Sequence, residues 1–322
     1  MTEWVWQCFL FVVGFFVLVK GAHWLVDGGS FLAKALGVSD FLIGLTVVAL
    51  GTSLPELFID ITAVVKGNTG LVIGNIIGAN VVNILLVLGI SAVIFPLKIH
   101  HGIVWREIPF TFVAAALVLL LGNDGLIEGA GYSRLGRIDG LVMMSFFAIY
   151  LYYLVSINKA IPLQQGSGGK KPEFVRLIIQ IVVGLLGLFF GARLIVGTAV
   201  FIAGKMHISE TMIGLTVVAL GTTLPELTAS IVAALKKRPD LALGNIVGSN
   251  IVNIFLILGV CSVIRPLPLR PQDNFAIAIA ILASFLLFTS AFVGKRGVID
   301  KWIGVAFISI YLIYVAIVIR LG

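Results

Sequence analysis

The sequence is poor in charged residues. Only 11% of its 322 residues are Asp, Glu, Lys or Arg, whereas 60% are hydrophobic. A soluble domain carries about 25% charged residues, and a disordered chain has low hydrophobicity, so both classes are excluded. Cysteine is nearly absent, since only Cys8 and Cys261 occur, each within an apolar stretch, which excludes a disulfide framework. The first residues include Glu3 but no basic segment, and the apolar run continues past Val19, so no cleavable signal peptide is expected.

Long apolar stretches recur from end to end. They approach or exceed the roughly 20 residues that a helix needs to cross a bilayer, and charges gather in the short breaks between them. The chain is therefore predicted to be an all-α integral membrane protein with ten transmembrane helices. The first and sixth spans are too long for one upright crossing and are expected to be strongly tilted. The predicted spans are Trp4–Leu36, Asp40–Val65, Thr69–Phe95, Ile103–Leu121, Ile138–Ile157, Phe174–Met206, Glu210–Leu235, Asp240–Ile264, Phe275–Val293 and Trp302–Ile319.

An internal repeat divides the chain into two halves. Residues 44–89 align without a gap with residues 214–259, and 28 of the 46 positions are identical. Weaker matches upstream extend the repeat to five spans, so we expect a first half at residues 1–158, a linker at 159–173 and a second half at 174–322. Because five is odd, the two halves are expected to be inverted in the membrane. Inverted repeats are typical of secondary transporters, whose substrate sites lie near the bilayer midplane.

The distribution of Lys and Arg predicts the orientation. Leaving out Lys20 and Arg193, which lie inside spans, 13 basic residues fall on the side of the linker and 7 on the other side. The positive-inside rule then places the linker in the cytoplasm and both termini outside. We expect a prokaryotic cytoplasmic (inner) membrane protein. The net charge of +7 is a topological signal, so no nucleic-acid partner is expected, and no obligate protein partner is evident.

Each half carries a proline and a glutamate near the middle of its second span. The two sequences are GLTVVALGTSLPEL, with Pro55 and Glu56, and GLTVVALGTTLPEL, with Pro225 and Glu226. A proline removes a helical hydrogen bond, so each span is expected to kink and to free backbone carbonyls. A carboxylate within a membrane is costly unless it has a partner, and it is a functional-site candidate by default. Because the basic residues within spans do not occupy equivalent positions of the repeat, a pair of structural ion pairs is disfavoured.

Small neutral oxygen donors surround the two glutamates. No thiol or imidazole lies near them, so the set favours a hard cation such as Ca2+ over zinc or copper. Taken alone, these hydroxyls are also explained by hydrogen bonds back to their own helix. The donors are Thr52, Ser53, Thr222 and Thr223.

The following span of each half contains GNIIGANVVNI or GNIVGSNIVNI. The glycines four apart in each motif are predicted to let neighbouring helices approach closely. Two asparagines three apart lie on one face of each helix, where a buried amide needs a partner. They are predicted to bind a cation through the amide oxygen, with interhelical hydrogen bonding as the alternative for the first of each pair. The first asparagines are Asn80 and Asn250, and the second are Asn83 and Asn253.

Other charged residues within the spans carry weaker signals. Asp60 lies one turn after Glu56, but its equivalent in the second half is Ser230, so Asp60 either lines a path to the site or approaches the aqueous end of its helix. His23 and Asp27 are four residues apart and are expected to form a local pair in the long first helix.

The motifs GTSLPEL and GTTLPEL, together with GNIIGAN and GNIVGSN, resemble the two alpha-repeats of the calcium/cation antiporter superfamily, whose best known members are Na+/Ca2+ exchangers. The resemblance covers essentially the whole chain. It implies that Glu56 and Glu226 are the central Ca2+ ligands. It further implies side-chain ligands at Thr52, Ser53, Thr222, Thr223, Asn83, Asn253 and Ser249, and backbone carbonyl ligands at Ala49 and Ala219.

Two departures from the family pattern bear on the counter-ion. Many sodium-coupled members have Asp at one of the positions held here by Asn83 and Asn253, and the serine matched by Ser249 is Ala79 in the first half. The linker at 159–173 is also far shorter than the Ca2+-sensing domains of animal exchangers, so no such regulation is expected.

The expected function is secondary active exchange of Ca2+ for Na+ by alternating access, in which the two cations compete for one carboxylate site. A Ca2+/H+ antiporter is the main alternative. A cation channel fits the polar midplane but not the inverted duplication, and an enzyme is disfavoured because HExxH and GxSxG motifs are absent. No cofactor is expected, and Ca2+ with Na+ or H+ is the cargo.

Overall fold

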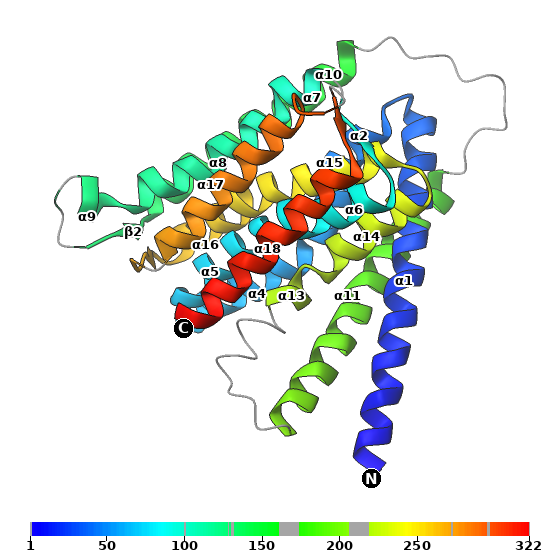
Figure 1. Cartoon of the computed structure of the whole chain (residues 1–322), viewed down its shortest axis with the longest axis horizontal. Helices are drawn as coiled ribbons and strands as arrows, with labels where there is room; N and C mark the ends of the chain where they lie inside the picture. Colours follow the sequence, from blue (N-terminus) through cyan, green and yellow to red (C-terminus); the bar gives the residue numbers. More distant parts are fainter. Residues whose placement is uncertain are drawn as a thin grey trace.

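The computed structural model describes residues 2–321 except for residues 100, 128, 130, 131, 161–173, 206–218, 272, 295 and 296. The described part is a bundle of long helices with four two-residue strands (Figure 1). The elements before the expected linker are α1 (Thr2–Leu36), α2 (Asp40–Ile43), η1 (Gly44–Val48), α3 (Ala49–Thr52), α4 (Leu54–Val65), α5 (Thr69–Val81), η2 (Val82–Val87), α6 (Leu88–Ile94), β1 (Leu97–Lys98), α7 (His101–Trp105), α8 (Glu107–Gly122), α9 (Asp124–Ile127), β2 (Arg134–Leu135) and α10 (Arg137–Ala160). Those after it are α11 (Phe174–Lys205), α13 (Ala219–Thr222), α14 (Leu224–Leu235), α15 (Pro239–Ile251), η4 (Val252–Leu258), α16 (Gly259–Ile264), β3 (Leu267–Pro268), α17 (Asp273–Ser290), β4 (Val298–Ile299) and α18 (Lys301–Leu321).

Within the described residues, nine helical runs are long and apolar enough to cross a membrane, and they correspond to nine of the ten predicted spans. The protein is therefore a multi-pass membrane protein. Of the seventh predicted span, residues 219–235 form α13 and α14, and the preceding residues lie outside the described part. Most of the predicted linker, residues 161–173, also lies outside it.

The third and eighth predicted spans form the centre of the bundle. In the apolar stretch of the span formed by α5, η2 and α6, 78% is buried inside the protein. The buried share is 83% in the span formed by α15, η4 and α16. For α11 and α18 it is only 22%, so these helices face outward. Phe255 is fully buried in the apolar core, and its ring stacks with that of Phe146 at a centroid distance of 5.4 Å.

Local signals in the sequence explain where the helices of the second span begin and end. Ser39 begins α2, because its Oγ accepts a hydrogen bond from the Leu42 amide at 3.2 Å. Gly67 ends the turn after α4 in the left-handed region with φ of 89°. The equivalent residue of the second half, Lys237, adopts φ of 56°, so the repeated turn is kept even where a side chain makes it costly.

The two sequence halves pack closely against each other. Strand β1 pairs antiparallel with β4, and β2 pairs antiparallel with β3. Helix α6 packs against α18, and α16 packs against α10. Every one of these contacts joins an element of the first half to one of the second, so neither half closes its core alone.

Helices α1 and α11 lie side by side along most of their length and extend together away from the other helices (Figure 1). Glycines make this close approach possible. A Cβ at Gly21 would lie 2.7 Å from the carbonyl oxygen of Gly184, and a Cβ at Gly191 would lie 2.5 Å from the backbone nitrogen of Leu18. Packing of small residues at the crossing therefore replaces the side-chain interdigitation of a soluble helix pair.

The glycine seam predicted from the repeated motif is present in the second half. A Cβ at Gly244 would lie 2.4 Å from the carbonyl oxygen of Phe41, and one at Gly248 would lie 2.7 Å from that of Leu45. Helix α15 thereby contacts α2 and η1 through backbone. In the first half, no atom of the described residues lies within 4 Å of a Cβ at Gly74 or Gly78. Residues 210–218, which are equivalent to α2 and η1, lie outside the described part.

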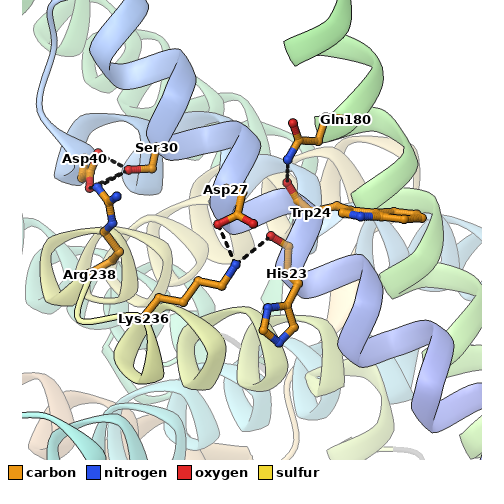
Figure 2. A network of polar contacts seen from close by, with 8 residues as sticks. All are labelled: His23, Trp24, Asp27, Ser30, Asp40, Gln180, Lys236 and Arg238. Atoms are coloured by element: carbon orange, nitrogen blue, oxygen red, sulfur yellow. Dashed lines mark hydrogen bonds and ion pairs between the residues drawn. The ribbon is translucent and has the colours of Figure 1, made fainter.

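A polar network ties α1 to the hairpin between α14 and α15 (Figure 2). Lys236 Nζ lies 2.6 Å from Asp27 Oδ1 and also donates to the carbonyl oxygen of His23 at 3.4 Å. Asp27, which the sequence predicts to pair locally with His23, forms its ion pair with Lys236, a lysine 209 residues away that tertiary packing brings to it. In the same network, Arg238 Nη1 lies 3.0 Å from Asp40 Oδ2.

The glycine contacts between α1 and α11 lead to a stability prediction. Replacing Gly191 by Ala should lower the stability by about 1–3 kcal/mol, because the added methyl overlaps the backbone of α1 and the helices must separate. Gly197→Ala is the matched control, since no atom of the described residues lies within 4 Å of a Cβ at that position. The apparent melting temperature of the purified protein in detergent is the measurement, and equal values for the two variants would contradict this packing.

Candidate cation site

The second span of the first half is interrupted beside its glutamate. Helix α3 ends at Thr52, Ser53 adopts φ of −83° and ψ of 0°, and α4 begins at Leu54 with Pro55 in its first turn. The second half repeats this geometry at Thr223, with φ of −88° and ψ of 1°. A proline in the first turn of a helix loses no hydrogen bond, because amides there have no intrahelical acceptor.

Each interruption places a glutamate in the first turn of the following helix. Glu56 lies in the first turn of α4 and Glu226 in that of α14, and both are fully buried. The positive end of the helix dipole favours a negative charge there. Ser53 Oγ donates a hydrogen bond to Glu226 Oε1 at 3.1 Å, so the break in one half contacts the glutamate of the other. The two glutamates also lie close enough to interact electrostatically.

No basic side chain of the described residues forms an ion pair with either glutamate. The ion pairs of Glu3, Asp27 and Asp40 do not involve either glutamate. Both oxygens of Glu56 and Oε2 of Glu226 are buried without a hydrogen-bond partner in the protein. Buried carboxylate oxygens in this state are rare in folded proteins, because their desolvation is unfavourable.

Four asparagines cross-link the third and eighth spans beside the glutamates. Asn83 Nδ2 donates to Asn250 Oδ1 at 3.1 Å, and Asn253 Nδ2 donates to Asn80 Oδ1 at 3.2 Å. Asn80 Nδ2 donates to the carbonyl oxygen of Asn250 at 3.2 Å. The first asparagine of each pair thus makes the interhelical hydrogen bonds that the sequence left as its alternative reading.

These hydrogen bonds commit the amide nitrogens of Asn83 and Asn253 and leave their amide oxygens free to accept. Both Oδ1 atoms are buried and have no hydrogen-bond partner in the protein. An amide whose nitrogen is fixed in this way can offer only oxygen to a ligand. Together with the glutamates, the described part of the chain therefore holds five unpartnered acceptor oxygens on the two repeated motifs: Glu56 Oε1, Glu56 Oε2, Glu226 Oε2, Asn83 Oδ1 and Asn253 Oδ1.

The predicted hydroxyl ligands differ in what they contact. Thr52 Oγ1 lies 3.5 Å from Ser249 Oγ, so these two predicted ligands from opposite halves are neighbours. Thr223 Oγ1 donates to the carbonyl oxygen of Leu220 at 3.0 Å, which is the local helix bond expected from a threonine. The hydroxyl hydrogen of Thr223 is thus taken up within its own helix, whereas that of Ser53 faces Glu226.

The two alanines predicted as carbonyl donors begin α3 and α13. The Ala49 carbonyl oxygen accepts the Ser53 amide at 3.1 Å, which leaves one lone pair. Ala79 stands where the second half has Ser249 and is buried, so the first half lacks that hydroxyl.

Sequence reasoning missed two site neighbours, Asn75 and Asn245. They are identical and equivalent in the repeat, and each lies within hydrogen-bond distance of a predicted ligand of the opposite half: Thr222 for Asn75, and Thr52 for Asn245. Their identity across the repeat was the signal that could have found them.

Comparisons with known proteins identify the family of this chain. The pattern of the family described as "Sodium/calcium exchanger protein" matches residues 6–156 and 176–320. A membrane protein of Methanocaldococcus jannaschii is 35% identical, with 95% of this chain and 96% of the relative covered. The sodium/calcium exchanger MaX1 of Methanosarcina acetivorans is 31% identical, with 96% and 97% covered.

Solved structures agree as well. The sodium-calcium exchanger NCX_Mj, soaked with Na+ and without Ca2+, superposes with a TM-score of 0.85 at 34% identity, covering 97% of this chain and 99% of that one. Family pattern, relatives and fold all extend over nearly the whole chain. This protein therefore belongs to the sodium/calcium exchanger family.

Proposed function

We propose that this protein is a secondary active antiporter that exchanges Ca2+ for Na+ by alternating access at the site between its repeated motifs. The observation that carries the proposal is the set of five buried acceptor oxygens without a hydrogen-bond partner or basic neighbour among the described residues. An all-oxygen set that includes carboxylates matches the ligands that Ca2+ prefers. The family membership supports the same reading.

The residues divide into ligands of different charge. Glu56 and Glu226 supply the negative charge, and Asn83 and Asn253 supply neutral amide oxygens. The remaining ligands are the hydroxyls of Thr52, Ser53, Thr222, Thr223 and Ser249 and the carbonyl oxygens of Ala49 and Ala219.

Exchange follows from the cost of leaving the carboxylates uncompensated. Two like charges in a poorly solvated site are unfavourable, so a bound cation stabilises the protein in every state that excludes water. If only the cation-loaded site passes between the two sides, one cation leaves only when another replaces it. Competition for one site thereby becomes coupled transport.

The proposed architecture is two inverted halves, residues 1–158 and 174–322, joined by a cytoplasmic linker at 159–173, with ten spans and both termini outside the cytoplasmic membrane. The contacts between halves support it, because β1 with β4 and β2 with β3 pair reciprocally. We assign the movement between states to α1 and α11, which pack together on backbone and glycine and extend from the rest of the bundle.

A Ca2+/H+ antiporter is the second candidate, and one observation favours it. Asn83 and Asn253 stand where many sodium-coupled relatives have one Asp, so this site has one carboxylate fewer with which to hold Na+. In that case Glu56 and Glu226 would carry protons on the return step.

The two candidates are separated by the driving gradient. We expect purified protein in proteoliposomes to take up 45Ca2+ when an outward Na+ gradient is imposed at matched membrane potential, and not with an outward H+ gradient alone. Uptake driven by an H+ gradient without Na+ would contradict Na+/Ca2+ exchange and establish Ca2+/H+ antiport. Uptake independent of both gradients would indicate a channel instead.

Removal of either site carboxylate should abolish exchange. Glu56→Gln and Glu226→Gln are each expected to reduce 45Ca2+ uptake to the level of protein-free vesicles, because one of two charges that bind the divalent ion is lost. Glu107→Gln is the matched control: Glu107 is also a buried glutamate within a span, and like Glu226 it accepts one hydrogen bond, from Tyr153 at 2.6 Å, and has one oxygen without a partner, but it lies outside the repeated motifs. Near-normal uptake by Glu56→Gln would refute the site, as would equal loss in all three variants.

A further inference from the structure

Asn75 and Asn245 contact the proposed ligands through a hydrogen bond that is repeated in both halves. Thr52 Oγ1 donates to Asn245 Oδ1 at 3.1 Å, and Thr222 Oγ1 donates to Asn75 Oδ1 at 3.4 Å. Each bond crosses between halves, because the asparagine of one half accepts from the threonine of the other. Neither asparagine is a ligand in the site as proposed above.

The orientation of the Asn245 amide is set by acceptors on its other side. Asn245 Nδ2 donates to the carbonyl oxygen of Glu226 at 3.3 Å and to Ser230 Oγ at 2.9 Å. A backbone carbonyl can only accept, so the amide nitrogen must face Glu226 and the amide oxygen must face Thr52.

Asn75 is oriented in the same sense by different chemistry. Asn75 Nδ2 donates to both carboxylate oxygens of Asp60, at 3.0 and 3.2 Å. Asp60 occupies the position of Ser230 in the repeat, is buried, and has no basic partner in the described part of the chain. Both halves therefore keep an acceptor at this position, a carboxylate in one and a hydroxyl in the other.

The direction of the threonine hydrogen decides what the site can offer a cation. A hydroxyl has one hydrogen and two lone pairs, and it binds a cation only when its hydrogen points elsewhere. Thr52 has other acceptors within reach, the carbonyl oxygen of Ala49 at 3.3 Å and Ser249 Oγ at 3.5 Å, and both belong to proposed ligands. By accepting the hydrogen, Asn245 turns the Thr52 lone pairs away from itself and also keeps the Ala49 carbonyl available.

We propose that Asn75 and Asn245 are positioning residues of the cation site, held by Asp60 and Ser230, which fix the hydroxyls of Thr222 and Thr52 as cation acceptors. The proposal rests on the Ca2+ site proposed above and adds an outer layer to it. Such outer partners orient metal ligands and tune affinity without touching the ion. The layer acts on affinity for the ion, so KM for Ca2+ should change more than the maximal rate.

The first test is Asn245→Leu, measured as 45Ca2+ uptake under the driving gradient that supports uptake by the wild type. KM for Ca2+ should rise about tenfold with little change in maximal rate. An unchanged KM in the folded variant would overturn the proposal. Asn123→Leu is the control for loss of a buried amide, because Asn123 and Asn274 form hydrogen bonds of 2.9 Å with each other and not with the site residues. An equal rise in KM in that variant would also overturn the proposal.

A double-variant cycle distinguishes positioning from general damage. If Asn245 acts through Thr52, then Thr52→Val with Asn245→Leu should have the same KM as Thr52→Val alone, because the hydroxyl to be oriented is already absent. If the two substitutions acted independently, their fold-changes in KM would instead multiply in the double variant. Multiplied KM changes would show that Asn245 supports the fold rather than the ligand.

Asp60 provides a test that leaves both asparagines in place and so remains informative if Asn245→Leu does not fold. Asp60→Ser copies the chemistry of the second half, where Ser230 reaches the amide at 2.9 Å, and should keep KM near the wild-type value. Asp60→Val removes the acceptor and should raise KM about tenfold. Equal loss in both variants would show that the charge of Asp60, not its hydrogen bond, is required.

The outcomes separate this inference from the proposed function. A wild-type protein that takes up no Ca2+ under either gradient refutes the exchanger assignment and the positioning role with it. Normal wild-type uptake with no KM change in Asn245→Leu and Asp60→Val refutes the positioning role alone.

Discussion

Two carboxylates buried within a membrane, with no basic side chain of the described residues beside them, are the constraint on which the rest of this structure depends. Glu56 and Glu226 have three buried oxygens that no protein donor satisfies. A soluble protein would pair or expose such groups, and a membrane offers no water in which to expose them. In the proposed antiporter, a bound cation lowers their free energy, and the oxygens around them are its ligands.

The backbone meets this constraint with one device used twice. Interruption of the second span at Ser53, and of its repeat at Thr223, places each glutamate at the start of a new helix, where the helix dipole favours its charge. Pro55 and Pro225 lie in the first turn of these helices, where a proline costs no hydrogen bond. Irregular backbone at this depth is tolerated because the neighbouring spans bury it, and those spans belong partly to the opposite half.

In the proposed site, Asn83 and Asn253 offer oxygen to the cation without offering hydrogen. An amide carries both donors and acceptors, so its nitrogen must be occupied before its oxygen is selective for cations. Asn80 and Asn250 occupy the nitrogens of Asn253 and Asn83 across the interface between halves. Through these reciprocal contacts, each half satisfies amide nitrogens of the other.

The sequence by itself determined the membrane class, nine of the ten predicted spans, the duplication and the repeated glutamates, because hydrophobicity, proline and identity across a repeat are read residue by residue. It could not choose between ligand and structural roles for Asn80 and Asn250, it overlooked Asn75 and Asn245, and it did not predict the ion pair of Asp27 with Lys236. Only the tertiary structure decided these points. Hydrogen bonds between Thr52 and Asn245, 193 residues apart, or between Lys236 and Asp27, 209 apart, depend on how the halves pack, and amide direction depends on which acceptor stands behind each nitrogen. Such pairings leave no periodicity in a single sequence.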